Sequence, residues 1–338
     1  MTIDQLLEKW FAEFNPKQRK VVTARFGLKS GEKATLQEIG NELGVTRERV
    51  RQIGDYLLKK LSAPIQKEAE TLLRSAESYL ASLGGVVKDD EFLAEVADKF
   101  LNKESAKNLD RKLAFIFLAA GMPQYQKETD DYHAFWYTDE AAKRKFLDFS
   151  KKVHQHFKSS KKEKILSDKS YRKEFPDLES KRELNIAKFF GVNMFGDFGL
   201  SEWPEIRPKT IRDKAYLVLK KNAKPMHFEE IANAIGKLHP ERKGAHIQTV
   251  HNELIKGAEK FVLVGRGIYG LSEQGYEPGT VREVITKLLK KKGPMGADEV
   301  VRLVNQQRFL KQNTIMLGLQ NKNYFRKLND GRYSVKEA

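Results

Sequence analysis

The side chains best suited to contact a charged or hydrogen-bonding partner form one short run near the start of the chain. The run comprises Thr46, Arg47, Glu48, Arg49, Arg51 and Gln52. Arg47 can donate two hydrogen bonds to a guanine edge, Glu48 can accept one from the cytosine amino group, and Gln52 lies one helical turn further on the same face. Arg49 and Arg51 are suited to phosphate oxygens. Such a run is also typical of a solvated helix face with local ion pairs, and spacing alone leaves both interpretations open.

Residues for catalysis or metal binding show no comparable arrangement. The chain has no cysteine, which excludes disulfides, thiolate zinc sites and cysteine nucleophiles. Of its seven histidines, His154 and His156 do not pair with carboxylates at metal-ligand spacing. His239, His246 and His251 could approach one another, and we expect them to have surface or packing roles. The stretch Gly265-Arg266-Gly267 lacks the Lys-Ser or Lys-Thr of a phosphate-binding loop, and no Gly-x-Ser-x-Gly elbow occurs. We therefore expect a protein that is not an enzyme and that requires neither a metal nor another cofactor.

The overall charge favours a polyanionic partner. The 338 residues include 62 Lys and Arg against 46 Asp and Glu, a net charge of +16. A field of this sign raises encounter rates with nucleic acid. No apolar run approaches the ~18 residues of a membrane span, and the acidic start of the chain, Met1-Thr2-Ile3-Asp4-Gln5, does not resemble a secretory signal. We expect a cytoplasmic protein without a membrane partner.

The elements that position the polar run are short helices with clear start and stop residues. Apolar spacing predicts helices at 5–14, from Pro16 to about residue 26, at 36–43, and from Arg47 to about residue 61. Thr35 with Glu38 forms a capping-box pattern, and Gly44 suits the turn between the last two helices. The apolar residues expected to close a small core between those helices are Ile39, Leu43, Val45, Val50, Ile53 and Leu57. This spacing predicts a helix-turn-helix.

Three stretches resemble region 4 of the sigma-70 family over roughly residues 5–62: Arg25-Phe26-Gly27-Leu28, Thr35-Leu36-Gln37-Glu38-Ile39-Gly40 and Val45-Thr46-Arg47-Glu48-Arg49-Val50-Arg51-Gln52-Ile53. The resemblance implies that the fourth helix reads the −35 element of promoter DNA and that the earlier helices contact the β flap of core RNA polymerase. By the same resemblance, Arg47, Glu48 and Gln52 contact bases, while Arg49 and Arg51 face the DNA backbone or an activator. Gly54 departs from the family, which usually has an acidic residue there, and is expected to loosen the helix by about 1 kcal/mol.

A complete initiation factor of this family also has a strand-melting region 2 before region 4. Only a few residues precede the match in this sequence. We therefore expect a transcription factor built on a sigma-type module rather than a sigma factor in its own right.

The remainder of the chain shows a weak internal repeat of roughly 62–71 residues. A helix, a Gly or Pro break and a second helix recur, and two of the repeats end in a clear glycine-containing hairpin, at 261–271 and 325–335. We interpret these as tandem winged-helix units. The predicted fold class is thus mainly α with small β wings, in five domains: 1–64, 66–140, 141–206, 207–275 and 278–338.

Residues 207–275 also resemble the HARE-type helix-turn-helix domain, which occurs in the δ subunit of bacterial RNA polymerase. The residues that carry this resemblance are Pro208–Ala215 and Pro225–Ile231. Further DNA contacts are expected from Arg266 in a wing turn, reaching a minor groove, and from Lys143, Arg144 and Lys145. Those three lysine and arginine residues lie in the most basic window, 141–173, with 12 Lys and Arg against 3 Asp and Glu. Ordinary solvated surfaces remain the alternative for both places.

Together these features predict a sequence-specific DNA-binding transcription regulator of the bacterial cytoplasm, associated with the nucleoid and acting with RNA polymerase at initiation. Two alternatives stay open. One is a δ-type accessory subunit of RNA polymerase with little sequence specificity. The other is the DNA-recognition component of a restriction or DNA-processing system.

Overall fold

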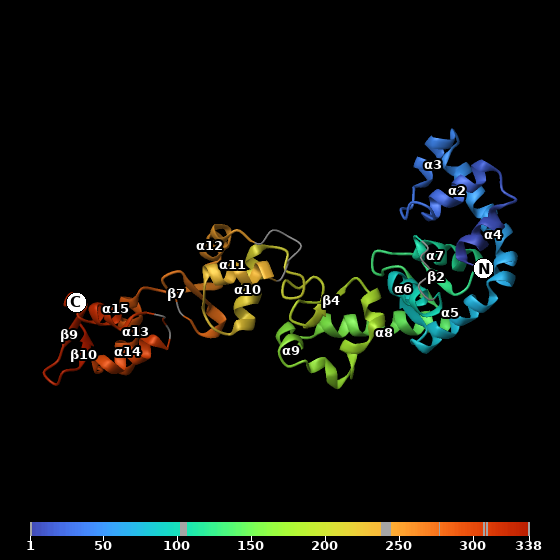
Figure 1. Cartoon of the computed structure of the whole chain (residues 1–338). Helices are drawn as coiled ribbons and strands as arrows, with labels where there is room; N and C mark the ends of the chain where they lie inside the picture. Colours follow the sequence, from blue (N-terminus) through green and yellow to red (C-terminus); the bar gives the residue numbers. More distant parts are fainter. Residues whose placement is uncertain are drawn as a thin grey trace. The chain divides into compact units, whose positions relative to one another are not determined.

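The computed structural model describes residues 2–101, 107–237, 245–276, 278–306, 308 and 310–336. The fold is mainly helical with small antiparallel sheets, as the sequence predicts (Figure 1). The chain forms two compact units, one of residues 1–192 and 197–201 and the other of residues 193–196 and 202–338.

The first unit begins with four helices: α1 (Ile3–Phe11), α2 (Pro16–Phe26), α3 (Leu36–Leu43) and α4 (Arg47–Glu68). The last three begin at the predicted residues, whereas α1 lies about two residues earlier than predicted. Thr35 Oγ1 accepts from the Glu38 backbone N–H, and a Glu38 carboxylate oxygen accepts from the Thr35 N–H at 2.7 Å. Both predicted turn glycines have left-handed backbone angles, with φ of 66° at Gly27 and 65° at Gly44. The helix-turn-helix of α3 and α4 is therefore confirmed.

Two cores hold these helices. The smaller one, between α2, α3 and the start of α4, contains Val21, Ile39 and Val50, with Leu43, Val45 and Ile53 partly buried against it. Leu57, which we expected there, packs instead in a larger core with Leu61 and Ile65. Leu57, Leu61 and Ile65 are four residues apart and share one face of α4, and that face packs in the larger core. The helix continues about two turns beyond its predicted end and crosses residues 64–66, where the sequence predicts a domain boundary.

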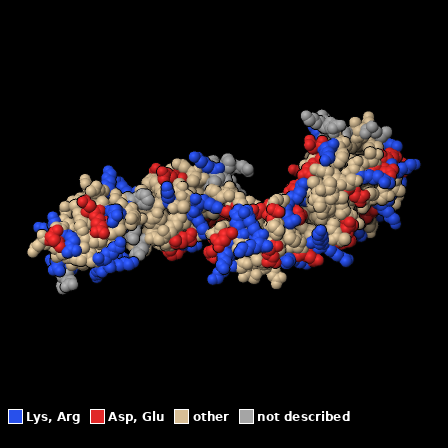
Figure 2. Space-filling view, turned by 90° about the horizontal axis from the view of Figure 1, so that it is seen from below, with Lys and Arg blue, Asp and Glu red and all other residues tan. Residues whose placement is uncertain are grey.

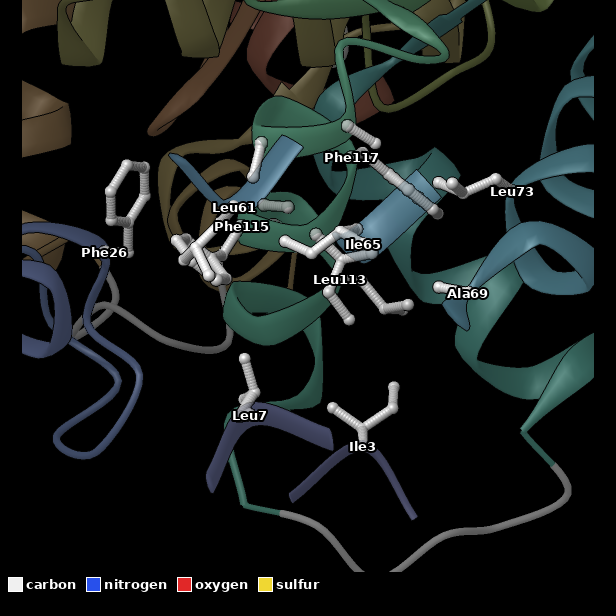
Figure 3. Packing of buried hydrophobic residues seen from close by; sticks show 14 of the residues in the cluster. Ile3, Leu7, Phe26, Leu61, Ile65, Ala69, Leu73, Leu113, Phe115 and Phe117 are labelled. Atoms are coloured by element: carbon white, nitrogen blue, oxygen red, sulfur yellow. The ribbon is translucent and has the colours of Figure 1, made fainter. Parts of the chain in front are cut away.

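The larger core joins the helix-turn-helix to the residues that follow it. Residues 70–137 fold as α5 (Glu70–Ser82), β1 (Val86–Lys88), α6 (Asp89–Phe100), α7 (Leu109–Ala120), β2 (Gln124–Gln126) and β3 (Phe135–Tyr137), with an antiparallel sheet of order β1-β3-β2. Figure 3 shows Leu61 and Ile65 of α4 next to Leu113 and Phe115 of α7. The Phe115 ring also packs edge-on against the Phe26 ring of α2, with 5.1 Å between the ring centroids. The α4–α7 contact is therefore internal to one folded body.

Residues 141–206 differ in element order from the body at 70–137. A long helix, α8 (Glu140–Ser159), is followed by the short α9 (Lys162–Leu166), three 3-10 turns within 170–186, and a hairpin of β4 (Phe190–Val192) and β5 (Phe198–Leu200). Phe157 of α8 packs against Tyr171, Phe190 and Phe198. Aromatic packing on one long helix thus takes the place of the second and third helices of a repeat.

The second unit contains two small bodies with the element order already seen at 70–137. The first has α10 (Ile211–Asn222), β6 (Met226–His227), α11 (Phe228–Lys237), α12 (Ile247–Lys256), β7 (Phe261–Gly265) and β8 (Ile268–Leu271), with strand order β6-β8-β7. The second has α13 (Val281–Lys292), α14 (Ala297–Asn305), α15 (Gln312–Leu319), β9 (Phe325–Lys327) and β10 (Tyr333–Val335). An antiparallel bridge between Met295 and Tyr333 stands where the other bodies have their first strand. Each body has its own apolar core.

Candidate nucleic-acid interface

The polar run that opens α4 lies on the outer face of the helix-turn-helix. Thr46 caps the helix, and its Oγ1 accepts from the Arg49 N–H at 3.1 Å. Val50 is fully buried and Ile53 half-buried, which fixes the rotation of the helix. The six predicted contact residues are consequently all exposed: Thr46, Arg47, Glu48, Arg49, Arg51 and Gln52. This whole face of the helix is therefore open to a duplex groove.

Glu48 and Arg51 hold each other in the unbound protein. Arg51 donates two hydrogen bonds to the Glu48 carboxylate, at 2.9 and 2.7 Å, and a third to Asp55 at 2.8 Å. The Arg51 guanidinium therefore lowers the pKa of Glu48, which stays ionised and can act only as an acceptor. This ion pair is the feature that the solvated-face interpretation predicts. A base contact by Glu48 would have to share or replace it.

Arg47 is presented differently. Within the described residues it makes no side-chain hydrogen bond, so its five N–H donors face solvent. Arg49 and Gln52 form only a long contact of 3.4 Å. Of the run, Arg47 is thus the side chain that can form a forked contact with a guanine edge at the least cost in broken protein contacts.

A contact that sequence reasoning missed explains Gly54. The glycine is buried, and a Cβ added there would lie 2.0 Å from Nη1 of Arg25. Arg25, from α2, crosses the helix at this point and donates to Asp55 at 3.2 Å. The acidic residue that the family usually has at position 54 would occupy the space of that guanidinium. The carboxylate that Arg25 contacts belongs to Asp55, one residue later, and the only signal of this in the sequence is the acidic residue next to the glycine.

The cluster at 143–145 divides into buried and exposed members. Lys143 is paired with Glu140 at 3.5 Å and stands over the Tyr137 ring at 4.9 Å, with only 20% of its side chain exposed. Arg144 and Lys145 are exposed on α8. A phosphate contact by Lys143 would therefore require it to leave the tyrosine, whereas Arg144 and Lys145 are accessible as they stand.

Arg266 lies at the tip of the β7–β8 hairpin and is exposed. Gly267 beside it has φ +71°, and a Cβ there would lie 2.5 Å from Nε2 of His227. The glycine is therefore required both by its backbone angle and by the close histidine. Arg266 is thus accessible at a hairpin tip whose shape Gly267 fixes.

The described part of the chain shows neither a metal site nor a membrane span. There, no group of three or more His, Cys, Asp or Glu residues is placed to hold a metal ion. Among the same residues, no helix is both long and apolar enough to cross a bilayer.

Comparison with known proteins bears on the helix-turn-helix. The family model for sigma-70 region 4 matches residues 10–63. This confirms the resemblance over roughly 5–62. The matched residues form a DNA-binding module of the kind linked to transcription by RNA polymerase.

Three curated relatives match in that region. RNA polymerase sigma factor RpoS of Coxiella burnetii is 43% identical over 65 residues, which are 19% of this chain and 18% of the relative. RNA polymerase sigma factor SigA of Clostridium acetobutylicum is 47% identical over 64 residues, 19% of this chain and 17% of the relative. SigA of Nostoc is 47% identical over 58 residues, 17% of this chain and 15% of the relative. The chain thus covers less than a fifth of each of these relatives.

Proposed function

We propose that the protein is a sequence-specific DNA-binding transcription regulator that acts with RNA polymerase at initiation in the bacterial cytoplasm. The observation that carries this proposal is the exposed Arg47 at the start of a capped helix, inside a sigma-70 region 4 match. Arg47, Glu48 and Gln52 would contact base edges of a −35-like element, and Arg49 and Arg51 its phosphates.

RNA polymerase is the proposed protein partner because the matched relatives are RNA polymerase sigma factors. The apolar faces of α1 and α2 are buried against α7, through residues such as Phe11 and Phe26. A contact with the polymerase β flap would therefore use the exposed polar faces of these helices, or would displace α7.

The bodies at 70–137, 211–271 and 281–335 support a winged-helix interpretation, because each places a hairpin after its third helix. We propose that the bodies at 211–271 and 281–335 extend the contact with DNA, and that the acidic body at 70–137 extends the contact with polymerase. For residues 207–275, the HARE-type resemblance favours the same class of partner.

Affinity purification from a native bacterial lysate tests the polymerase part of the proposal. We expect the tagged full chain to recover polymerase β even after nuclease treatment of the lysate. Without nuclease treatment, it should also recover promoter DNA. An Arg47→Ala/Glu48→Ala variant should keep polymerase and lose the enrichment of particular promoters. Recovery of a nuclease in place of polymerase would contradict the proposal and favour a DNA-processing system. Recovery of polymerase with no promoter preference in either protein would favour a δ-type subunit.

A further inference from the structure

The net positive charge of the chain is unevenly distributed. Residues 66–140 carry 9 Lys and Arg against 15 Asp and Glu, a net of −6. Residues 278–338 carry 13 Lys and Arg against 5 Asp and Glu, a net of +8 in a body of similar size. Figure 2 shows Lys and Arg side chains around the part of the molecule that contains α13 to β10, at the left of the view.

Part of the most basic sequence window, by contrast, is neutralised by folding. In 141–173, Lys152 is paired with Glu174, and Lys169 and Arg172 are paired with Glu179. Both glutamates lie just beyond the window, so the linear count overstates the positive charge of this surface. The C-terminal body has fewer such compensating carboxylates.

Four cations of that body surround one hollow of about 650 Å³ beside the β9–β10 hairpin: Lys322, Arg326, Lys327 and Lys336. All four side chains are exposed. No ion pair joins any of them to an acidic residue within the described part of the chain, and no described Asp or Glu lines the hollow. We call these four residues the hairpin cation cluster.

The carboxylates of the described part of this body lie away from the hollow. Asp330 binds Arg332 at 2.7 Å, outside the cluster. Glu283 accepts from the Thr280 N–H at 2.7 Å as part of a helix cap. Asp298 and Glu299 lie in the first turn of α14, where the helix dipole favours negative charge. None of these carboxylates lines the hollow, which therefore has a positive potential that an external anion can neutralise.

We propose that the hairpin cation cluster binds the phosphate backbone of duplex DNA without regard to sequence, and so anchors the chain at a second point. The apolar residues that line the hollow are buried: Leu319 is 0%, Phe325 3% and Tyr333 9% exposed. Recognition there rests on charge, which suits a phosphate backbone better than an amphipathic peptide with apolar anchors. A second hollow of the same body, lined by Lys287 and Lys290–Lys292, extends the cationic surface as a long polyanion requires. The proposal rests on the proposed function only in taking DNA as the partner.

The salt dependence of duplex binding by the full chain tests this proposal. Each phosphate neutralised contributes roughly 0.9 to the slope of log K against log salt. A Lys322→Gln/Arg326→Gln/Lys327→Gln/Lys336→Gln variant should therefore lower that slope by about 3 to 4 on a duplex of arbitrary sequence. Between 50 and 200 mM salt, the wild type should lose roughly 150-fold more affinity than the variant does.

The matched control removes four cations from the acidic segment: Lys67→Gln/Arg74→Gln/Lys107→Gln/Lys127→Gln. It should leave the slope within experimental error of the wild type. Equal slopes for wild type and cluster variant, or equal decreases for cluster variant and control, would overturn the proposal. So would a cluster variant that loses binding to polyglutamate while duplex binding is unchanged, because the surface would then fit an acidic protein. Should the fourfold variant fail to fold, Lys322→Gln/Lys336→Gln should lower the slope by about 2.

The result is separable from that of the proposed function. Base preference depends on Arg47 and Glu48, and the salt slope on random DNA depends on the cluster. A normal decrease in slope with no base preference would contradict the promoter-reading proposal alone, and the reverse outcome would contradict the anchor alone.

Discussion

Gly54→Ala tests the packing of Arg25 across the recognition helix. The new Cβ would lie 2.0 Å from Nη1 of Arg25, so the two cannot both keep their positions. Because that nitrogen is the tip of a flexible side chain, we expect the guanidinium to move rather than the helix. Its 3.2 Å contact with Asp55 would then be lost.

Two opposing terms decide the magnitude. Alanine in a helix interior is favoured over glycine by about 1 kcal/mol. The displaced ion pair has side chains 23% and 45% exposed, and a pair of this kind contributes about 0–1 kcal/mol. Gly54→Ala alone should therefore stabilise α4 by about 0–1 kcal/mol, whereas in an Arg25→Ala background it should give the full ~1 kcal/mol.

Amide hydrogen exchange read by mass spectrometry on peptides from α2 and α4 measures these differences in the full chain. The four proteins of the cycle are wild type, Gly54→Ala, Arg25→Ala and the double variant. The alanine should slow exchange in α4 more strongly when Arg25 is absent. Identical effects of Gly54→Ala in both backgrounds would refute the proposed contact and leave the glycine as a simple helix weakness.

Four other substitutions test the rest of the fold. Ile65→Ala, at a fully buried site of the larger core, should lower stability by about 2–5 kcal/mol. Amide exchange should then become faster in α1 and α7 together, and an effect confined to α4 would contradict a shared core. Gly267→Ala should lower stability by more than the ~1–2 kcal/mol that a left-handed backbone costs, because the new Cβ also meets His227. Gly331→Ala, with open space around it, should lower stability only by the backbone cost. Amide exchange in β7 and β8 measures the first effect, and exchange in β9 and β10 the second. Burial raises the pKa of Glu179, but hydrogen bonds from Tyr171, Arg172 and Lys169 outweigh it and hold the pKa at about 2. The stability that ionised Glu179 contributes is thus fully present above pH 4.5, its ordinary pKa, and is lost as the pH falls toward 2. The melting temperatures of wild type and Glu179→Gln should therefore converge between pH 4.5 and 2.

Local signals in the sequence were enough for the helix-turn-helix. The hydrogen bonds between Thr35 and Glu38 join residues three positions apart, and the backbone angle of Gly44 depends on its own residue type. Both therefore follow from neighbouring residues in the sequence. The exposed face of α4 followed in the same way from the apolar positions Val50 and Ile53.

Contacts between distant residues could not be predicted in this way. Arg25 reaches Asp55 across 30 positions, and Phe115 reaches Phe26 across 89, so neither pairing has a local pattern. The same limit applies to charge. A basic window in the sequence says nothing of carboxylates such as Glu174 that folding brings to it, which is why the linear count favoured 141–173 over the C-terminal body.

The central claim is that Arg47 reads a base, and a protein–DNA double-mutant cycle tests it most directly. Duplexes selected by the wild type would be changed at one base pair at a time and their affinities compared for wild type and Arg47→Ala at fixed salt. At one position, the change should cost the wild type about 1–3 kcal/mol and cost Arg47→Ala close to nothing, while the other positions keep their effect in both proteins. If every position cost both proteins the same amount, Arg47 would be a phosphate contact or a solvated side chain, and the base-reading account would be wrong.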